Sequence, residues 1–487
     1  MTEQYYFVCS IGPVQELIAT ARTSQDLWFG SWMLSELAKA AAKTLQDGGH
    51  TLIFPAPKSD LKPGSEVNVT NKVVALINGN PKDVGDVVWQ AIEYRRDALR
   101  DDSFGRVQGK FDRDEALKQL EDLIEFYWAA SPYDESKGDD AYKEARDRAE
   151  ALLAARKVTR HFAQAHGQEG KPKSSLDGFR ESVLPREPQK GFPFWKYKAE
   201  KGESLSGVDL LKRWGERQDD VRFVSTTDLA AKPFEIYLGE RCEPLRQAVE
   251  ALFLPIAERS ETPGTLFYVD RLVQLIEDEQ KTANFREALA KLFREHKVDR
   301  QPLPYYALLQ ADGDNMGKTI TAQEEMQKHS DLSNALSGFA GKAKTIITEY
   351  DGVPVYVGGD DVLAYLPLHT ALDCVSALND KFNELVGSHF KYVDNKGTAA
   401  HPTLSAGLAI AHHLTPLSDV LKQARRAEKA AKQVPGKHGL VISLSKRSGT
   451  ERQVTGKLVE LAGRMECLID FTRKKAISHG VPYELES

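Results

Sequence analysis

The chain has 487 residues, of which 41% are hydrophobic and 28% charged, and its formal net charge is −6 at pH 7. This length exceeds a single compact core and predicts two to four domains of a folded globular protein. No stretch approaches the roughly 18 apolar residues of a membrane span, and no basic region precedes the N-terminal apolar run, so neither a membrane segment nor a signal peptide is expected.

The first 85 residues alternate between strand and helix patterns. YYFVCSIG predicts a strand, and the proline that follows, Pro13, suits the first turn of a helix. TLIFPAP and NKVVALI predict further strands by about residue 78. We therefore expect a first domain over residues 1–85.

The region from 86 to 300 is predicted to be mainly helical. Its first part, to about residue 165, is charged and rich in Ala, Leu, Glu, Lys and Arg, which favour helices. Residues 166–206 are rich in Gly, Pro, Lys and Ser and predict a long flexible loop. Helical patterns then resume from about 208 to 295.

The region from 301 to 445 has the most regular pattern. PYYALLQA predicts a strand, a helix follows over 331–350, and VYVGGDDVLAYLP predicts a hairpin. A helix, the strand PTLSAGLAIAH and a final basic helix complete the order βαββαβα. This ferredoxin-like order, shared by polymerase palms and nucleotide cyclases, predicts an α+β fold, with a short helical segment over 446–487.

The hairpin tip places two carboxylates, Asp360 and Asp361, directly after Gly358 and Gly359. Adjacent carboxylates repel each other unless a proton or a cation neutralises them, so a functional pair implies a divalent metal. An isolated GGDD is equally consistent with an ordinary solvated turn, because turns use these residues freely.

Two more carboxylates, Asp312 and Asp314, follow the first strand of this region. The first strand and the hairpin of a βαββ sheet can lie side by side, so these acids are expected near Asp360 and Asp361. Three or four carboxylates would then meet at one edge and would hold two ions, Mg²⁺ or Mn²⁺, about 3.5–4 Å apart, as nucleotidyl transfer requires.

The loop around these acids resembles two other motifs only superficially. DGDNMG begins like an EF-hand, but Met316 and Gln323 occupy positions where calcium loops have Asp or Asn and Glu. GDNMGKT has one residue too few between its glycines for a P-loop. Gly313 and Lys318 remain candidates to contact a nucleotide, as do Gly358 and Gly359 of the hairpin, which let a ligand approach the backbone.

A local basic excess follows the last strand, although the whole chain is acidic. Residues 415–457 contain ten Lys and Arg against three Asp and Glu, an excess of +7. Lys429 and Lys432 are candidate phosphate contacts, although a solvated helix face is the commoner fate of such a run. Ser405, on the preceding strand, is a candidate for a base pocket or an ordinary strand residue.

Six stretches together resemble a known family, the large polymerase/cyclase subunit of type III CRISPR RNA-guided effector complexes, most closely the type III-B form. They are SIGPVQELIATARTSQDLWFGSWMLSEL, VSTTDLAAKPF, DGDNMGK, YVGGDDVLA, LSAGLAIAHHLTPL and ARRAEKAAK. The resemblance spans most of the chain and implies two palm domains, of which only the second carries GGDD and is catalytic.

The resemblance also implies an activity. Asp312, Asp360 and Asp361 would hold the metals that join ATP molecules into oligoadenylate second messengers, expected to be cyclic, when target RNA binds. The implied partners are the other effector subunits, guide RNA and target RNA, in antiviral defence.

The chain departs from many relatives in two respects. It starts directly at the first palm and contains no His-Asp dipeptide, so HD nuclease activity is not expected. Its four cysteines lie far apart with no Cys-x-x-Cys pair, so no zinc site is expected between the palms, and a reducing cytoplasm suits them.

Two other functions stay open. A non-catalytic scaffold could bind guide and target RNA, although scaffolding does not require clustered carboxylates. A stand-alone GGDEF-like cyclic dinucleotide synthase would usually carry Glu in place of Asp361 and would assemble from two chains. The residues do not determine base choice, product length or linkage, or whether AMP is joined to a non-nucleotide acceptor.

Overall fold

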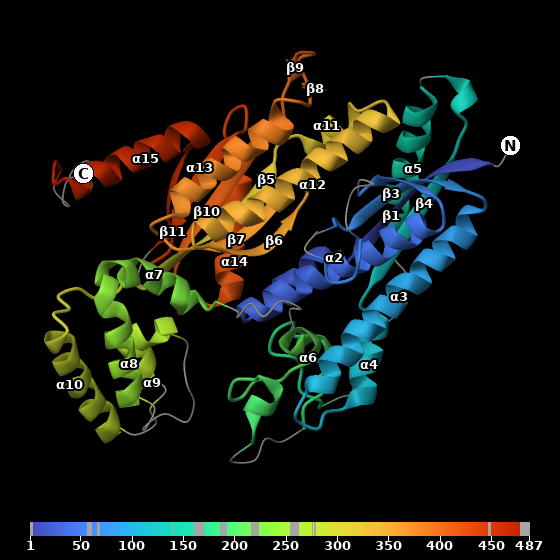
Figure 1. The fold of residues 1–487 in the computed structure, drawn as a ribbon. Helices are drawn as coiled ribbons and strands as arrows, with labels where there is room; N and C mark the ends of the chain where they lie inside the picture. Colours follow the sequence, from blue (N-terminus) through green and yellow to red (C-terminus); the bar gives the residue numbers. More distant parts are fainter. Residues whose placement is uncertain are drawn as a thin grey trace.

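The structure is a computed structural model of the chain (Figure 1). It describes residues 3–55, 61–65, 69–138, 140–159, 170–185, 192–215, 224–253, 263–274, 276, 279–446 and 450–477. Within these ranges, no helix is long and apolar enough to cross a membrane. The N-terminal and C-terminal parts of the chain each form a mainly antiparallel sheet that is covered by helices. Further helices connect the two parts (Figure 1).

The first sheet has four strands in the order β2-β3-β1-β4. Its strands are β1 (Gln4–Gly12), β2 (Thr51–Phe54), β3 (Lys72–Asn78) and β4 (Glu125–Tyr133). Its helices are α1 (Val14–Ala19), α2 (Ser24–Asp47), α3 (Pro81–Arg106), α4 (Arg113–Glu121) and α5 (Ala141–Val158). Alternate side chains of β1 point to opposite faces, so Phe7 and Cys9 pack in the core with α2 and α3, while Tyr6 and Val8 pack with α5.

Strand β4 interrupts the region over 86–300, for which the sequence predicts mainly helices. It pairs with β1 along its whole length, from Gln4 opposite Tyr133 to Gly12 opposite Glu125. The predicted boundary at residue 85 also falls inside α3. Long charged helices flank β4, and its pairing partner β1 lies more than 100 residues earlier in the chain. The composition of the region therefore does not reveal this strand.

The middle of the chain is helical, as predicted. Its helices are α6 (Gly207–Trp214), α7 (Thr226–Leu238), α8 (Cys242–Phe253), α9 (Val269–Gln274) and α10 (Glu279–Glu295). The expected loop over 166–206 lies partly outside the described residues. Its described parts contain a bridge between Lys173 and Glu181 and a 3-10 turn at Phe194–Tyr197.

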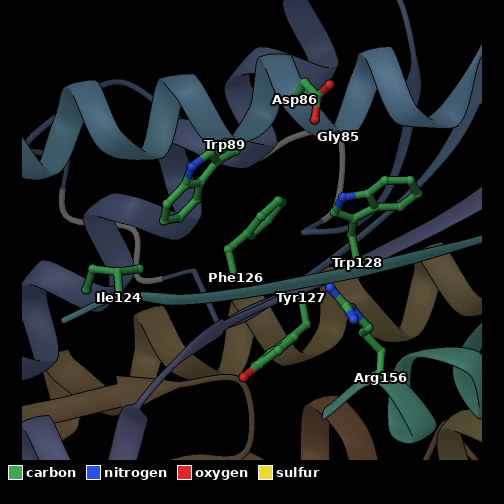
Figure 2. A pocket seen from close by; sticks show the side chains of 8 residues that line it. All are labelled: Gly85, Asp86, Trp89, Ile124, Phe126, Tyr127, Trp128 and Arg156. Atoms are coloured by element: carbon green, nitrogen blue, oxygen red, sulfur yellow. The ribbon is translucent and has the colours of Figure 1, made fainter. Parts of the chain in front are cut away.

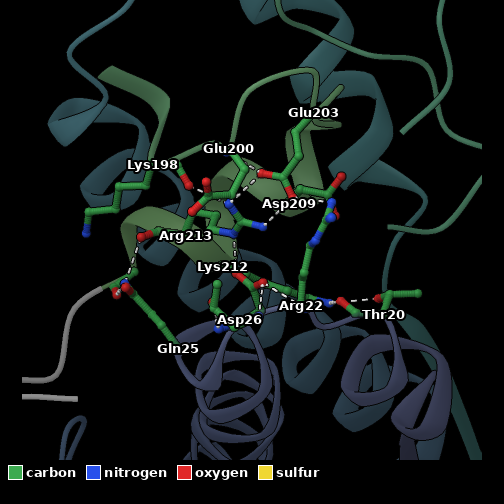
Figure 3. A network of polar contacts seen from close by, with 12 residues as sticks. Thr20, Arg22, Gln25, Asp26, Lys198, Glu200, Glu203, Asp209, Lys212 and Arg213 are labelled. Atoms are coloured by element: carbon green, nitrogen blue, oxygen red, sulfur yellow. Dashed lines mark hydrogen bonds and ion pairs between the residues drawn. The ribbon is translucent and has the colours of Figure 1, made fainter. Parts of the chain in front are cut away.

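A buried polar network fastens this middle region to the first sheet's helices (Figure 3). The Arg213 guanidinium, on α6, donates to Asp26 Oδ1 of α2 at 2.8 Å and forms an ion pair with Glu203 at 3.2 Å. Arg22 pairs with the other oxygen of Glu203 at 2.8 Å. Buried charges are stable only when paired in this way, so the network specifies one position of α6 against α2.

The second sheet has six strands in the order β12-β11-β10-β5-β7-β6. Its strands are β5 (Tyr305–Gly313), β6 (Val353–Gly358), β7 (Asp361–Leu366), β10 (Leu404–His412), β11 (Gly439–Leu444) and β12 (Arg452–Lys457). Its helices are α11 (Met316–Thr321), α12 (Met326–Glu349), α13 (Ala371–Phe382), α14 (Leu417–Ala431) and α15 (Leu458–Arg473). A short hairpin, β8 (Tyr392–Val393) with β9 (Ala399–Ala400), stands beside it.

This sheet confirms the predicted βαββαβα order and the α+β fold. Helices α12 and α13 cover one face, and α14 covers the other (Figure 1). The segment over 446–487, expected to be helical, contains α15 and also β12, which extends the sheet beside β11. Residues 478–487 lie outside the described part of the chain.

The two sheets belong to one packed body. The face of the second sheet opposite α12 and α13 shares a hydrophobic core with the N-terminal half of the chain. Tyr306, Leu308 and Tyr365 of this face belong to the same core as residues of α2. Arg146 of α5 donates to the carbonyls of Thr321 at 2.9 Å and Gln323 at 2.6 Å, at the C-terminal end of α11. The first half therefore supports the helix that follows the Asp312 loop.

We predict that Gly407→Ala destabilises the second half. A Cβ at Gly407, on β10, would lie 2.2 Å from the backbone nitrogen of Glu428 on α14, so strand and helix would have to separate. We expect a loss of about 2–3 kcal/mol in the free energy of unfolding, measured by urea denaturation and by amide exchange in β10. Gly338→Ala, in open space on α12, is the control and should gain about 0.5–1 kcal/mol. Equal stabilities of the two variants would contradict the close approach.

Candidate active site

The end of β5 and the tip of the β6–β7 hairpin meet at one edge of the second sheet. The β5–β7 register places Ala311 opposite Val362, so Asp312 and Asp361 come next on their strands and lie side by side. The hairpin turns between Gly358 and Asp361, with Gly359 at φ +65°, a left-handed conformation that glycine adopts without strain. The predicted convergence of Asp312 with the hairpin tip is therefore confirmed.

Close approach at this point depends on Gly313. A Cβ there would lie 2.8 Å from Oδ2 of Asp360, so any side chain would push the hairpin tip away from β5. Gly358 is similarly confined, because a Cβ there would lie 2.5 Å from the Tyr356 hydroxyl. Both glycines thus bring the carboxylates together, and this packing role is distinct from the nucleotide contact predicted for them.

The three clustered carboxylates repel one another. Burial, followed by the charge of Asp312, raises the pKa of Asp360 to about 7. The pKa of Asp361 is also raised, by the loss of water around it and by the charges of Asp360 and Asp312. The Asp361 residue as a whole is exposed, so repulsion from the neighbouring carboxylates is the main cause of its raised pKa.

One cation already approaches the cluster. The Lys432 ammonium, in the turn that ends α14, forms an ion pair with Asp312, and it lies 3.3 Å from Oε1 of Glu428. Burial alone would lower the pKa of Lys432, but the bond to Asp312 and the charge of Glu428 outweigh it and raise the pKa. Lys429, one turn earlier, is exposed to solvent.

Asp314 corrects the predicted four-carboxylate set. Its side chain is fully buried, and Oδ2 accepts hydrogen bonds from Thr403 Oγ1 and Ser405 Oγ, both at 2.8 Å, and from the His438 backbone at 3.0 Å. The strand ends at Gly313, so the alternation of a strand no longer governs where Asp314 points. Its carboxylate holds β10 and the start of β11 together.

Ser405 and Lys318 form hydrogen bonds with residues outside the carboxylate cluster. Ser405 is fully buried, donates to Asp314 and accepts from the Gly439 backbone at 3.1 Å, so it does not line an open base pocket. Lys318 donates to Asn395 Oδ1 at 2.6 Å, beside the β8–β9 hairpin. The structure therefore does not bring Lys318 to the carboxylates.

The sequence patterns missed three residues at this site. Thr70, just before β3, places its methyl carbon 3.3 Å from a Cβ built on Gly359, so the first half of the chain reaches the hairpin tip. Tyr356 lies close to the carboxylates: burial is the main cause of its raised pKa, and the charges of Asp361 and Asp360 raise it further. Of these three residues, Glu428 could have been found from the sequence, because it lies four residues before Lys432, a spacing that favours an ion pair on a helix.

Metal binding can be tested against the donor set. Among the residues that the structure describes, no group of three or more His, Cys, Asp or Glu side chains is arranged to hold a metal ion. The chemistry of Asp312, Asp360 and Asp361 nevertheless fits a divalent cation, because all are oxygen donors and their crowding leaves uncompensated negative charge. Asp314 does not belong to this set.

We predict that the metal-free chain loses stability as pH rises through the pKa of Asp360. The folded-state pKa of about 7 lies above the unfolded value of about 3.9, so the folded state holds the extra proton and stability falls between these values. With EDTA present, Asp360→Asn should gain about 1–2 kcal/mol at pH 8 and less at pH 5, after allowance for solvent screening. Thermal denaturation at both pH values measures this, and Asp373→Asn, at an exposed acid on α13, is the control. A gain that is the same at both pH values would refute the raised pKa.

Two family models match the chain. Residues 305–441 match the model described as Cas10/Cmr2, second palm domain, and residues 6–94 match that of CRISPR-associated protein Cmr2, N-terminal. The CRISPR system Cmr subunit Cmr2 of Pyrococcus furiosus is 33% identical over 199 residues, which span 36% of this chain and 22% of that relative.

Two solved structures are similar along almost the whole chain. The type III-B Cmr-beta complex in its apo state matches with a TM-score of 0.69 and 14% identity, covering 99% of this chain and 75% of that one. The same type of complex bound to cognate target RNA matches with a TM-score of 0.68 and 14% identity, covering 100% and 76%. At this identity the likeness concerns the fold.

Proposed function

This chain belongs to the Cas10/Cmr2 family, and on that premise we propose that it is a nucleotidyl transferase that joins ATP into oligoadenylates within a type III CRISPR effector complex. The observation that carries the proposal is the cluster of Asp312, Asp360 and Asp361 at the hairpin tip, with its excess of negative charge. Target RNA bound to the complex would activate the reaction, and the product is expected to be cyclic.

The reaction forms one phosphodiester and releases pyrophosphate. The 3′-hydroxyl oxygen of one nucleotide attacks the α-phosphorus of another, and the bond from that phosphorus to the bridging oxygen of the β-phosphate breaks. Asp312, Asp360 and Asp361 would hold Mg²⁺ or Mn²⁺. When bound, such ions activate the attacking hydroxyl and stabilise the leaving oxygen.

Lys432 provides the second part of the proposed site. Its ammonium partly neutralises Asp312. If Asp312 held a metal ion, the Lys432 ammonium could face a triphosphate instead. Lys432 would then compensate the charge of either group, while the exposed Lys429 contributes less.

The first half of the chain would present the second nucleotide. Thr70 packs against the hairpin tip, so a nucleotide on the carboxylates lies next to the first half. Residues 1–85 contain no GGDD, and we propose that this first palm is non-catalytic. Other effector subunits, guide RNA and target RNA are the proposed partners, in keeping with the target-RNA complex of the similar Cmr-beta structure.

We predict that Asp360→Ala combined with Asp361→Ala abolishes product formation. The assembled complex is incubated with ATP, Mg²⁺ or Mn²⁺ and matching target RNA, and products are identified by mass spectrometry. We expect a loss of at least about 10²–10³-fold in rate, because the variant lacks the transition-state charge stabilisation. Asp373→Ala, which removes an exposed acid of α13, should keep the rate. An unchanged rate in the double variant, or no product from the native complex, would favour a non-catalytic scaffold.

We predict that Lys432→Met impairs the same reaction more than Lys429→Met does. Both changes remove one positive charge from α14 or its end, but only Lys432 contacts Asp312. The expected loss is about 10- to 100-fold for Lys432→Met, mainly in the KM for ATP, and less than about threefold for Lys429→Met. Steady-state rates of pyrophosphate release measure both, and equal effects would contradict a specific role for Lys432.

A further inference from the structure

Strand β4 forms one edge of the first sheet, on the far side of β1 from β3 (Figure 1). Its nine residues, EFYWAASPY, carry a single charge, and the three consecutive aromatic residues Phe126, Tyr127 and Trp128 are all half-buried. Natural edge strands are usually protected by charged side chains, bulges or very short length. Strand β4 is nine residues long and pairs with β1 without a bulge; its one charged residue, Glu125, lies at its start, and Pro132 lies near its end.

An open groove of about 560 Å³ runs beside this edge (Figure 2). Helix α3 provides Gly85, Asp86 and Trp89, and the C-terminal end of α5 provides Arg156. Figure 2 shows Phe126 and Trp128 on the side of β4 that faces α3, and Tyr127 and Arg156 on the other side. Both faces of the edge strand therefore open into the groove.

The aromatic wall is held rigidly by the core. Trp89 stacks on Phe126 and Trp128 stacks on Phe7, each with 5.5 Å between ring centroids. A Cβ at Gly85 would lie only 2.6 Å from the Trp128 indole, so the glycine lets α3 lie directly on this ring. A preorganised wall of this kind binds at a low entropic cost.

The shape and charge of the groove favour an extended polypeptide. An edge strand offers alternate backbone N–H and C=O groups to a further strand, and flanking pockets can take that strand's alternate side chains. The charged residues among those that line the groove, Asp86 and Arg156, are both exposed and opposite in charge, so this lining has no net positive charge to attract a phosphate backbone. The aromatic side suits apolar side chains, and Arg156 suits an acidic one.

We propose that β4 is a docking edge for an extended segment of another protein subunit, which adds a fifth strand to the first sheet. The segment places apolar side chains against Trp89, Phe126 and Trp128 and an acidic side chain against Arg156. This inference rests on the proposed function only in taking the partner from the effector complex.

Deuterium exchange of the isolated full-length chain and of the assembled complex tests the added strand. The outward-facing amides of β4 should exchange about tenfold more slowly in the complex, while the alternate amides already bonded to β1 stay slow in both. Unchanged exchange over 124–131 in an assembled complex would overturn the proposal. Protection that disappears after ribonuclease digestion, with the subunits still bound, would assign the groove to RNA and would also overturn it.

A charge reversal tests the acidic partner residue. Arg156→Glu should weaken subunit binding by about fivefold to tenfold, whereas Arg148→Glu, at an exposed position on the same helix outside the groove, should change it less than twofold. Equal effects would contradict the charge pairing. Oligoadenylate synthesis is measured on the same samples, so that the two proposals can fail separately. An inactive complex with a protected β4 edge refutes the proposed activity alone. An active complex with an unprotected β4 edge refutes the docking proposal alone.

Discussion

The candidate site is organised around the repulsion between three carboxylates. The β5–β7 register sets Asp312 beside Asp361, and the hairpin turn adds Asp360. Like charges in partly dehydrated surroundings are unfavourable, and the raised pKa of Asp360 expresses this cost. The neighbouring features either permit the approach, as Gly313 does, or offset the charge, as Lys432 does.

Holding such an arrangement requires a rigid frame, which the packing of the two halves provides. Arg146 of α5 binds the carbonyls at the end of α11, and Tyr142 lies 2.7 Å from the His329 ring, which burial keeps neutral by lowering its pKa to about 3. Because a hydrophobic core continues from α2 into the second sheet, the two halves form one body. The hairpin tip is thus held in place by packing between both sheets.

Two features of the first sheet face different parts of the molecule. The loop before β3 reaches the hairpin tip through Thr70, while β4, on the opposite edge of the sheet from β2, presents backbone groups outward. The buried network of Arg213, Asp26 and Glu203 keeps the intermediate helices in place against α2. The first half thus contacts the candidate site through Thr70 and carries the proposed docking edge on β4.

The sequence by itself determined the α+β class, the βαββαβα order and the position of GGDD at a hairpin tip next to Asp312. These features depend on hydrophobic periodicity and turn chemistry, which act between residues close in the chain. Tertiary structure decided the rest. It turned Asp314 toward Thr403 and Ser405, paired Lys432 with Asp312, recruited β4 into the first sheet and brought Thr70 to Gly359. Each of these contacts joins residues far apart in the chain, and no local pattern specifies which distant partner a polar group or a strand will find.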